Sequence, residues 1–255
     1  MRGCFTLEYS FMAEAAQHLR SAAEVVRMNP VAQAVNGLCY AKFGDTALAD
    51  TDLERIVAAV PQTISAALTK KAYYFVPLTA ADGEDTVVAE HYSVEASDRA
   101  SCHRNYNVGG SQCVFISTRL MQDKFSIAFE FFINVGHAFV EHAGVSQDFA
   151  DLVWAQALKN VRGESSIDAW DARRRATTDP ANIDERAKTE FLSAAFSDAI
   201  AVYLLSLTVD FDYYDLRERD YSLLAPQALA ERLRKIAEIF PPNPGYEFAI
   251  YYRRR

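Results

Sequence analysis

One stretch of the chain, Gln112 to Gly144, carries polar side chains inside an otherwise apolar segment. Its pattern predicts a strand at 113–117 and then a helix over 124–143, with Asp123 as the N-cap and Gly144 after the last turn. The polar residues of this helix recur at spacings of three or four and share one face: Ser126, Glu130, Asn134, His137 and Glu141. The helix is apolar nearly all round, which is typical of a core helix, and polar groups buried there must be hydrogen-bonded, paired or metal-bound. We therefore expect unusual chemistry, or its remnant, on this polar stripe.

Residues 133–139 of this helix resemble the zinc-binding helix of the zincin metallopeptidases. That helix carries two histidines one turn apart, which bind one zinc ion, and a glutamate just after the first histidine, which acts as general base. In this chain His137 stands at the second histidine position. Ile133 and Asn134 occupy the positions of the first histidine and of the glutamate.

The resemblance continues into the later helix expected at 184–207. Zincins of the gluzincin and ImmA/IrrE types return a third zinc ligand from such a helix, in a Glu-x-x-x-Asp-like segment. Asp198 matches the acid of that segment, whereas Ala194 holds the ligand position. Over residues 112–206 the resemblance thus implies a zincin-like fold with a dismantled zinc site. It implies a pseudoenzyme that binds a protein or peptide, with no catalytic residues and no cofactor.

Two further interpretations remain open for the polar stripe. In the first, Glu130, Asn134, His137 and Asp198 form a buried polar network that only stabilises the fold. In the second, the protein is an active metal-dependent hydrolase that holds one divalent transition metal through Glu130, His137, Glu141 and Asp198, as facing helices in bundles do. A structural or assembly protein that docks a partner through its tyrosine-rich surface is a third class of function.

A separate group of possible metal ligands lies before the central helix. Cys102, His103, Cys113 and His91 include the residue types of a structural zinc site, but they lack the tight Cys-x-x-Cys spacing. Cys113 lies on an apolar strand, where a buried and inert thiol is the expected state.

Composition narrows the class of protein. The 255 residues carry a formal net charge of -8, which disfavours nucleic acid and anionic membranes as partners. No apolar run approaches a membrane span, and four cysteines are too few for a disulfide scaffold, so we expect a cytoplasmic protein with reduced thiols. The arginine clusters at 173–175 and 253–255 are expected to be solvated.

The expected fold is α+β and mostly helical, with a small antiparallel sheet packed beside the buried central helix. We expect an N-terminal helical subdomain over 1–71 and a zincin-like α+β domain with a helical C-terminal part over 72–255. The predicted helices, in addition to those above, are 7–28, 31–43, 51–71, 148–161 and 226–240. Strands are expected at 72–77, 86–93 and 246–252, and a polar surface loop with room for a short helix at 164–182.

Overall fold

The computed structural model describes residues 19–121, 123–179, 181–216 and 221–251. Helices make up 50% of the structure and strands 19%, in two small sheets, so the expected class of a mostly helical α+β protein is confirmed. The chain forms two compact units. Unit 1 consists of the described residues up to Ala58 together with Thr69–Glu130, and unit 2 consists of Ala59–Leu68 and the described residues from Phe131 onward.

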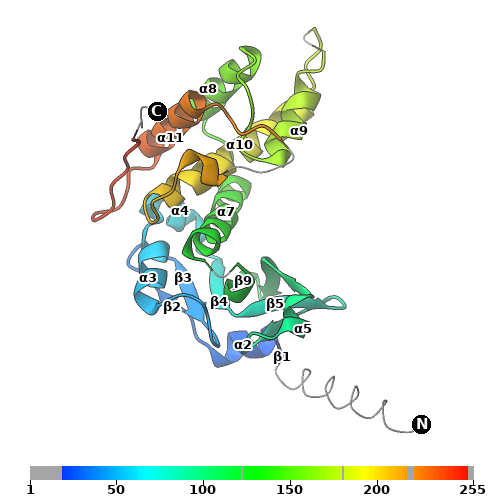
Figure 1. Ribbon diagram of the computed structural model, residues 1–255, viewed down its shortest axis with the longest axis vertical. Coiled ribbons are helices and arrows are strands. Elements are labelled where there is room, and N and C mark those ends of the chain that lie inside the picture. Colours follow the sequence, from blue (N-terminus) through cyan, green and yellow to red (C-terminus); the bar gives the residue numbers. More distant parts are fainter. Residues whose placement is uncertain (1–18, 122, 180, 217–220, 252–255) are drawn as a thin grey trace, which may run out of the picture. The chain divides into compact units, whose positions relative to one another are not determined.

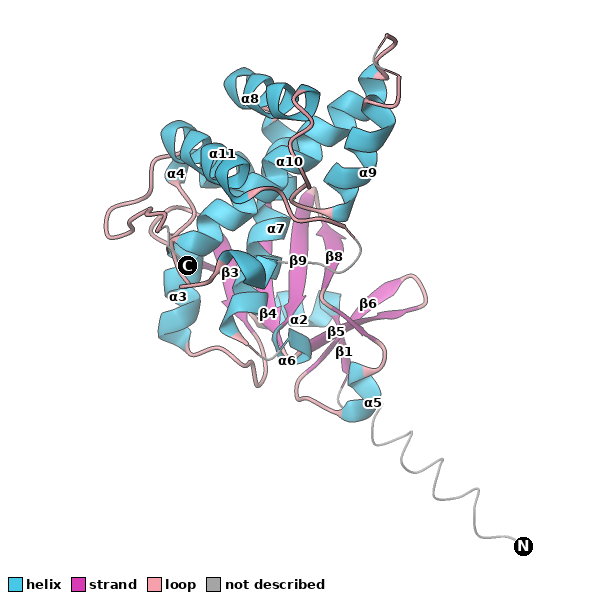
Figure 2. Cartoon of the chain, turned by 45° about the horizontal axis from the view of Figure 1, so that its top comes forward, coloured by secondary structure: helices cyan, strands magenta, loops and turns pink. Residues whose placement is uncertain are grey.

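Unit 1 contains both sheets (Figure 2). Its strands are β1 (Leu19–Ser21), β2 (Ala32–Gln33), β3 (Cys39–Lys42), β4 (Lys71–Val76), β5 (Leu78–Asp82), β6 (Asp85–Ala89), β7 (Ala100–Ser101), β8 (His103–Val108) and β9 (Ser111–Ser117). The helices of unit 1 are α2 (Ala22–Met28), α3 (Asp50–Ala58), α5 (Val94–Ser97) and α6 (Thr118–Met121), together with the first turns of α7 (Lys124–Ala143). One sheet has the antiparallel order β1-β6-β5-β7, and the other has the mixed order β2-β3-β4-β9-β8.

The sequence predicts one small antiparallel sheet, and the structure adds a second sheet of mixed direction. Strands β3, β4 and β9 run parallel, with Tyr40 opposite Tyr73 and Tyr73 opposite Val114. The inner strands β4 and β9 are buried over most of their length, and such continuous apolar runs are typical of parallel strands covered on both faces.

The helix predicted at 31–43 was also wrong, because this segment forms β2, a turn and β3. Gly37 adopts a φ of +90°, which no helix allows, and the buried Asn36 side chain donates to the Val57 carbonyl at 2.8 Å and accepts from the Leu38 amide. Tertiary pairing with β4 therefore overrides the local pattern. Within the expected helical subdomain over 1–71, the described residues up to Ala58 and Thr69–Lys71 belong to unit 1, whereas Ala59–Leu68 belongs to unit 2. Residues 1–18 lie outside the described part of the chain.

Unit 2 is helical (Figure 1). It contains α4 (Gln62–Ser65), the short 3₁₀ helix η1 (Ala66–Leu68), the larger part of α7, α8 (Gln147–Leu158), α9 (Ile167–Ala176), α10 (Glu185–Ser206), the 3₁₀ helix η2 (Tyr213–Leu216) and α11 (Pro226–Ile239). Helix α10 packs against α8, α9 and α11, and it is buried over most of its second half. Four aromatic rings fill the core beside it, with centroids 4.7–6.4 Å apart: Phe139, Phe149, Phe196 and Phe240.

The two long helices have the bounds that the sequence predicts. Helix α7 covers Lys124–Ala143, and the Asp123 carboxylate accepts from the Ser126 amide at 2.8 Å. Gly144 follows with a φ of +74°. Helix α10 begins after Asp184, whose side chain accepts from the amides of Arg186 and Ala187. In the described parts of the chain, none of the helices has an apolar stretch long enough to cross a bilayer.

Candidate functional site

Helices α7 and α10 cross in direct backbone contact within unit 2. A β-carbon added to Gly136 would stand 2.5 Å from the Ser197 carbonyl oxygen and 3.3 Å from the Ser197 α-carbon. Only glycine permits this approach, since real β-carbon contacts are not found at such distances. The crossing therefore fixes the residues next to Gly136 on α7 against those next to Ser197 on α10.

The crossing places His137 near Asp198. The two side chains interact electrostatically, and His137 favours the ionised form of the Asp198 carboxyl. The expected depth of His137 was wrong, however, because its side chain is exposed. The polar stripe faces solvent towards the end of α7: Asn134 is half-buried, and Glu141 is exposed like His137. A single solvent-facing strip is enough to accommodate these side chains without a buried network.

Asp198 is held from its other side by the loop before α9. The Ser165 hydroxyl donates to the Asp198 carboxylate at 2.8 Å, and the Ser166 hydroxyl bonds to the same carboxyl while it also caps α9. Burial raises the pKa of Asp198 above its ordinary value, and the two serines, His137 and Arg232 oppose that rise. The carboxyl therefore sits between an exposed imidazole and a loop that it helps to hold in place.

The other positions named by the zincin resemblance lie on the same part of the two helices. Ile133, Asn134 and Ala194 are all partly exposed. Ile133 and His137 are one turn apart on α7, and so are Ala194 and Asp198 on α10. We call this set the α7–α10 face: Ile133, Asn134, His137, Ala194 and Asp198.

Glu130 binds a histidine of the sheet, a partner that the sequence does not predict. Its carboxylate binds Nδ1 of His103 on β8 at 2.6 Å, and its side chain is largely buried, within unit 1. The neighbouring Cys102 lies at the surface, and partial desolvation of its thiol, together with the Glu130 charge, raises the thiol pKa. A raised thiol pKa disfavours the nucleophilic thiolate.

Possible metal ligands do not gather in the described residues. Among these residues, no three His, Cys, Asp or Glu side chains lie close enough together to hold one ion. The set expected on the two long helices, Glu130, His137, Glu141 and Asp198, therefore does not form a metal site. The same holds for the second set, Cys102, His103, Cys113 and His91. Cys113 is buried on β9, and burial raises the pKa of its thiol, as expected for an inert core cysteine.

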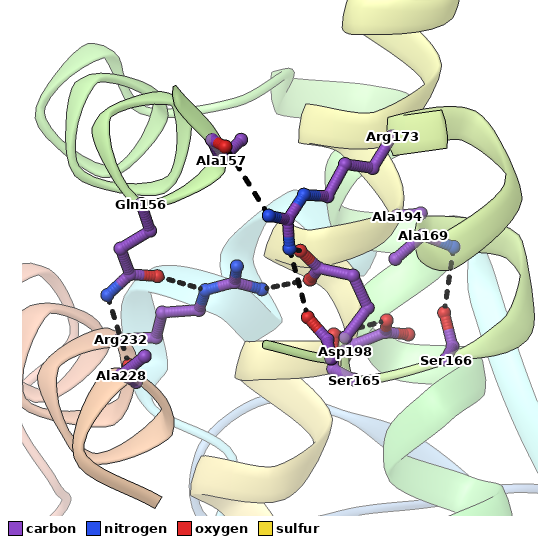
Figure 3. Close-up of polar contacts among 12 residues, drawn as sticks. Gln156, Ala157, Ser165, Ser166, Ala169, Arg173, Ala194, Asp198, Ala228 and Arg232 are labelled. Atoms are coloured by element: carbon purple, nitrogen blue, oxygen red, sulfur yellow. Dashed lines mark hydrogen bonds and ion pairs between the residues drawn. The ribbon is translucent and has the colours of Figure 1, made fainter. Parts of the chain in front are cut away.

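A buried charge cluster lies next to Asp198 in unit 2 (Figure 3). Glu164 is fully buried, and its two carboxylate oxygens accept from Nη1 of Arg173 at 2.9 Å and from Nη1 of Arg232 at 2.8 Å. The Arg232 Nε donates to Gln156 at 2.8 Å, and the Arg173 Nη1 also donates to the carbonyls of Val161 and Gly163. The cluster therefore ties α8, α9, α11 and the loop over 161–166 together.

This cluster was not predicted from the sequence. The segment 164–182 was expected to be a surface loop with room for a short helix, and it contains α9, but Arg173 was expected to be solvated and is buried. A signal was present, because both arginines fall on the apolar face of their helix. Arg173 lies among Ala169, Ala172 and Ala176, and Arg232 lies among Leu229, Leu233 and Ile236.

The α7–α10 face can form hydrogen bonds but lacks the parts of a hydrolytic zinc centre. The Asn134 amide can donate and accept, yet it cannot take a proton from water, and Ile133 and Ala194 offer no metal ligand. His137 remains as an exposed imidazole oriented beside a carboxyl. No family model, curated protein or solved structure matches the chain.

Proposed function

We propose that this protein is a zincin-like pseudoenzyme that binds a protein or peptide segment on the α7–α10 face instead of cleaving it. The observation that carries the proposal is the crossing at Gly136 and Ser197, which sets His137 beside Asp198. The resemblance implies this pairing of the motif helix with the later acid-bearing helix. Ile133, Asn134 and Ala194 replace the groups that zinc hydrolysis needs.

The chemistry of the face suits a peptide. An amide such as that of Asn134 can pair with a backbone N–H and C=O, and an imidazole can donate to or accept from a backbone group. Ile133 and Ala194 add a partly exposed apolar area between the polar groups. The proposal includes a cytoplasmic location, which is compatible with the free thiols of Cys39, Cys102 and Cys113.

The zincin-like geometry can be tested by restoring the missing groups. We expect the triple variant Ile133→His, Asn134→Glu and Ala194→Glu to bind one equivalent of zinc in equilibrium dialysis. The wild-type protein should stay metal-free at the same zinc concentration. Adding His137→Ala to the triple variant should abolish binding. A restored variant that folds, as judged by circular dichroism, but binds no zinc would contradict the zincin-like arrangement.

Metal analysis of the wild type separates the proposal from a working metallohydrolase. Protein purified without a histidine tag or chelator is analysed by mass spectrometry, beside its His137→Ala variant. The proposal expects no stoichiometric metal in either protein. One equivalent of a transition metal that His137→Ala removes would replace the pseudoenzyme proposal with the hydrolase.

Peptide binding is tested with a displayed library of random peptides selected on the wild-type protein. Peptides that occupy the α7–α10 face should lose at least about tenfold in affinity, roughly 1.4 kcal/mol, towards an Ile133→Arg variant. The matched control is His142→Ala, an exposed change on α7 outside the face, which should leave affinity unchanged. Selected peptides that bind both variants equally would place the binding surface elsewhere.

A further inference from the structure

The segment over residues 246–251 has the side-chain pattern of a β-strand. Tyr246, Phe248 and Ile250 are half-buried, whereas Glu247, Ala249 and Tyr251 are exposed. Such alternation is the geometry of an extended strand with one face against the protein. The inner face packs on unit 2, where the Phe248 ring lies 5.3 Å from the Tyr203 ring.

The turn before this segment holds it in place. The Asn243 side chain donates to the Val60 carbonyl at 2.8 Å and accepts from the Gln62 amide at 3.3 Å. The Tyr246 amide then closes a turn on the Asn243 carbonyl, with Pro244 and Gly245 at its centre and a Gly245 φ of +89°. These are the residues of a type II turn, so the chain enters the segment in a fixed direction.

Beyond Tyr246, the main chain of residues 247–251 has no strand partner in the described part of the protein. The sequence predicts a strand at 246–252, but residues 247–251 make no ladder hydrogen bond to any described strand. An ordered extended segment with aromatic and β-branched residues and unpaired amides and carbonyls is a template for pairing with another chain.

We propose that residues 247–251 pair antiparallel with the same segment of a second copy of this chain, and so form a two-fold symmetric dimer. Charge favours this partner and this direction. Glu247 lies at the start of the segment, and the sequence continues after Tyr252 with Arg253, Arg254 and Arg255. Antiparallel pairing brings the acidic start of one copy towards the basic end of the other, whereas parallel pairing sets like charges side by side.

The first test is the molar mass of the full chain by light scattering across a dilution series. We expect the mass to rise towards that of a dimer at high concentration. Ala249→Pro removes an exposed main-chain donor and should raise the dissociation constant at least tenfold. The matched control is Ala249→Ser, which keeps the donor and should leave the constant unchanged. Glu247→Arg should also weaken the dimer, because it sets basic groups against basic groups.

Amide hydrogen exchange of the wild-type protein gives a second readout that needs no variant. Protection at residues 247–251 should increase with protein concentration, while protection in the core of α10 stays constant. A protein that is monomeric at all concentrations would overturn the proposal. So would a dimer whose dissociation constant is the same in Ala249→Pro and Ala249→Ser.

Discussion

The Ser197 carbonyl oxygen lies 2.5 Å from the place that a β-carbon on Gly136 would take. Helices α7 and α10 therefore touch backbone to backbone, and even a methyl group has no space between them. The α7–α10 face is built around this contact, because Gly136 and Ser197 are the chain neighbours of His137 and Asp198.

The first prediction concerns Gly136→Ala. In an ordinary helix interior this change stabilises by about 1 kcal/mol, because alanine has the higher helix propensity. Here we expect the opposite sign, a loss of roughly 1–3 kcal/mol or more in the free energy of unfolding, since the helices must move apart. Urea unfolding measures the change, with the exposed His142→Ala on the same helix as the control. A stabilised Gly136→Ala protein would refute the backbone contact.

The second prediction concerns the fully buried carboxylate of Glu164. Glu164→Gln keeps the size of the side chain but removes the carboxylate charge that Arg173 and Arg232 share. Removing one partner of a buried ion pair leaves the other charge uncompensated, so we expect a loss of about 3–5 kcal/mol in the free energy of unfolding.

A matched control is available on α10. Glu190 also binds two arginines, Arg175 at 2.7 Å and Arg186 at 3.1 Å, but it lies at the surface. Water screens exposed ion pairs, so Glu190→Gln should leave the unfolding midpoint close to that of the wild type. If the two substitutions changed the free energy of unfolding equally, burial of the Glu164 cluster would contribute nothing to stability.

Local signals in the sequence predict the long helices of this protein well. Asp123 caps α7 as expected, and α10 begins within one residue of its expected start, after the N-cap Asp184. These signals are local, because an N-cap side chain bonds to amides only two or three positions away. The strand at β3 was missed for the opposite reason. Its residues pair with β4, which lies about thirty positions later in the chain, and no local pattern reports such a partner.

The sequence indicates which residues of the candidate site share a helix face, but it does not indicate how far these residues are buried. The three- and four-residue steps place Asn134 and His137 on one face of α7, yet the spacing does not say whether another element covers that face. The Glu164 cluster was missed because its charges compensate one another across separate elements. The signal that the sequence does carry is the place of Arg173 and Arg232 on apolar helix faces, because a buried arginine there requires an acid opposite it.

The third prediction concerns the pH dependence that Asp198 creates. Burial raises the pKa of this carboxyl in the folded state above its value in the unfolded chain. The folded protein therefore binds more protons between the two pKa values, and stability falls as pH rises through that range. The free energy of unfolding that the raised pKa contributes is fully present at pH values below the pKa of the carboxyl in the unfolded chain. It is lost as the pH rises through the pKa of the carboxyl in the folded protein. In Asp198→Asn this fall should disappear.

Urea unfolding of both proteins from pH 3 to pH 8 measures the effect. We expect Asp198→Asn to gain stability relative to the wild type as pH rises, because an amide pays no cost of ionisation while it can still accept from Ser165. Ser165→Ala serves as the control, since it removes a hydrogen bond but leaves the carboxyl able to titrate. Parallel curves for wild type and Asp198→Asn would contradict the raised pKa.

The fourth prediction separates a structural role of His137 from a binding role. The side chain is exposed, so His137→Ala removes little packing, and exposed substitutions usually change the free energy of unfolding by no more than about 0.5 kcal/mol. We expect the thermal midpoint of His137→Ala to match that of the wild type, while affinity for peptides selected on the α7–α10 face falls at least tenfold. His137→Gln should restore part of that affinity, because its amide can replace an imidazole hydrogen bond. A large loss of stability with unchanged peptide affinity would instead return His137 to the buried structural network that its sequence position first suggested.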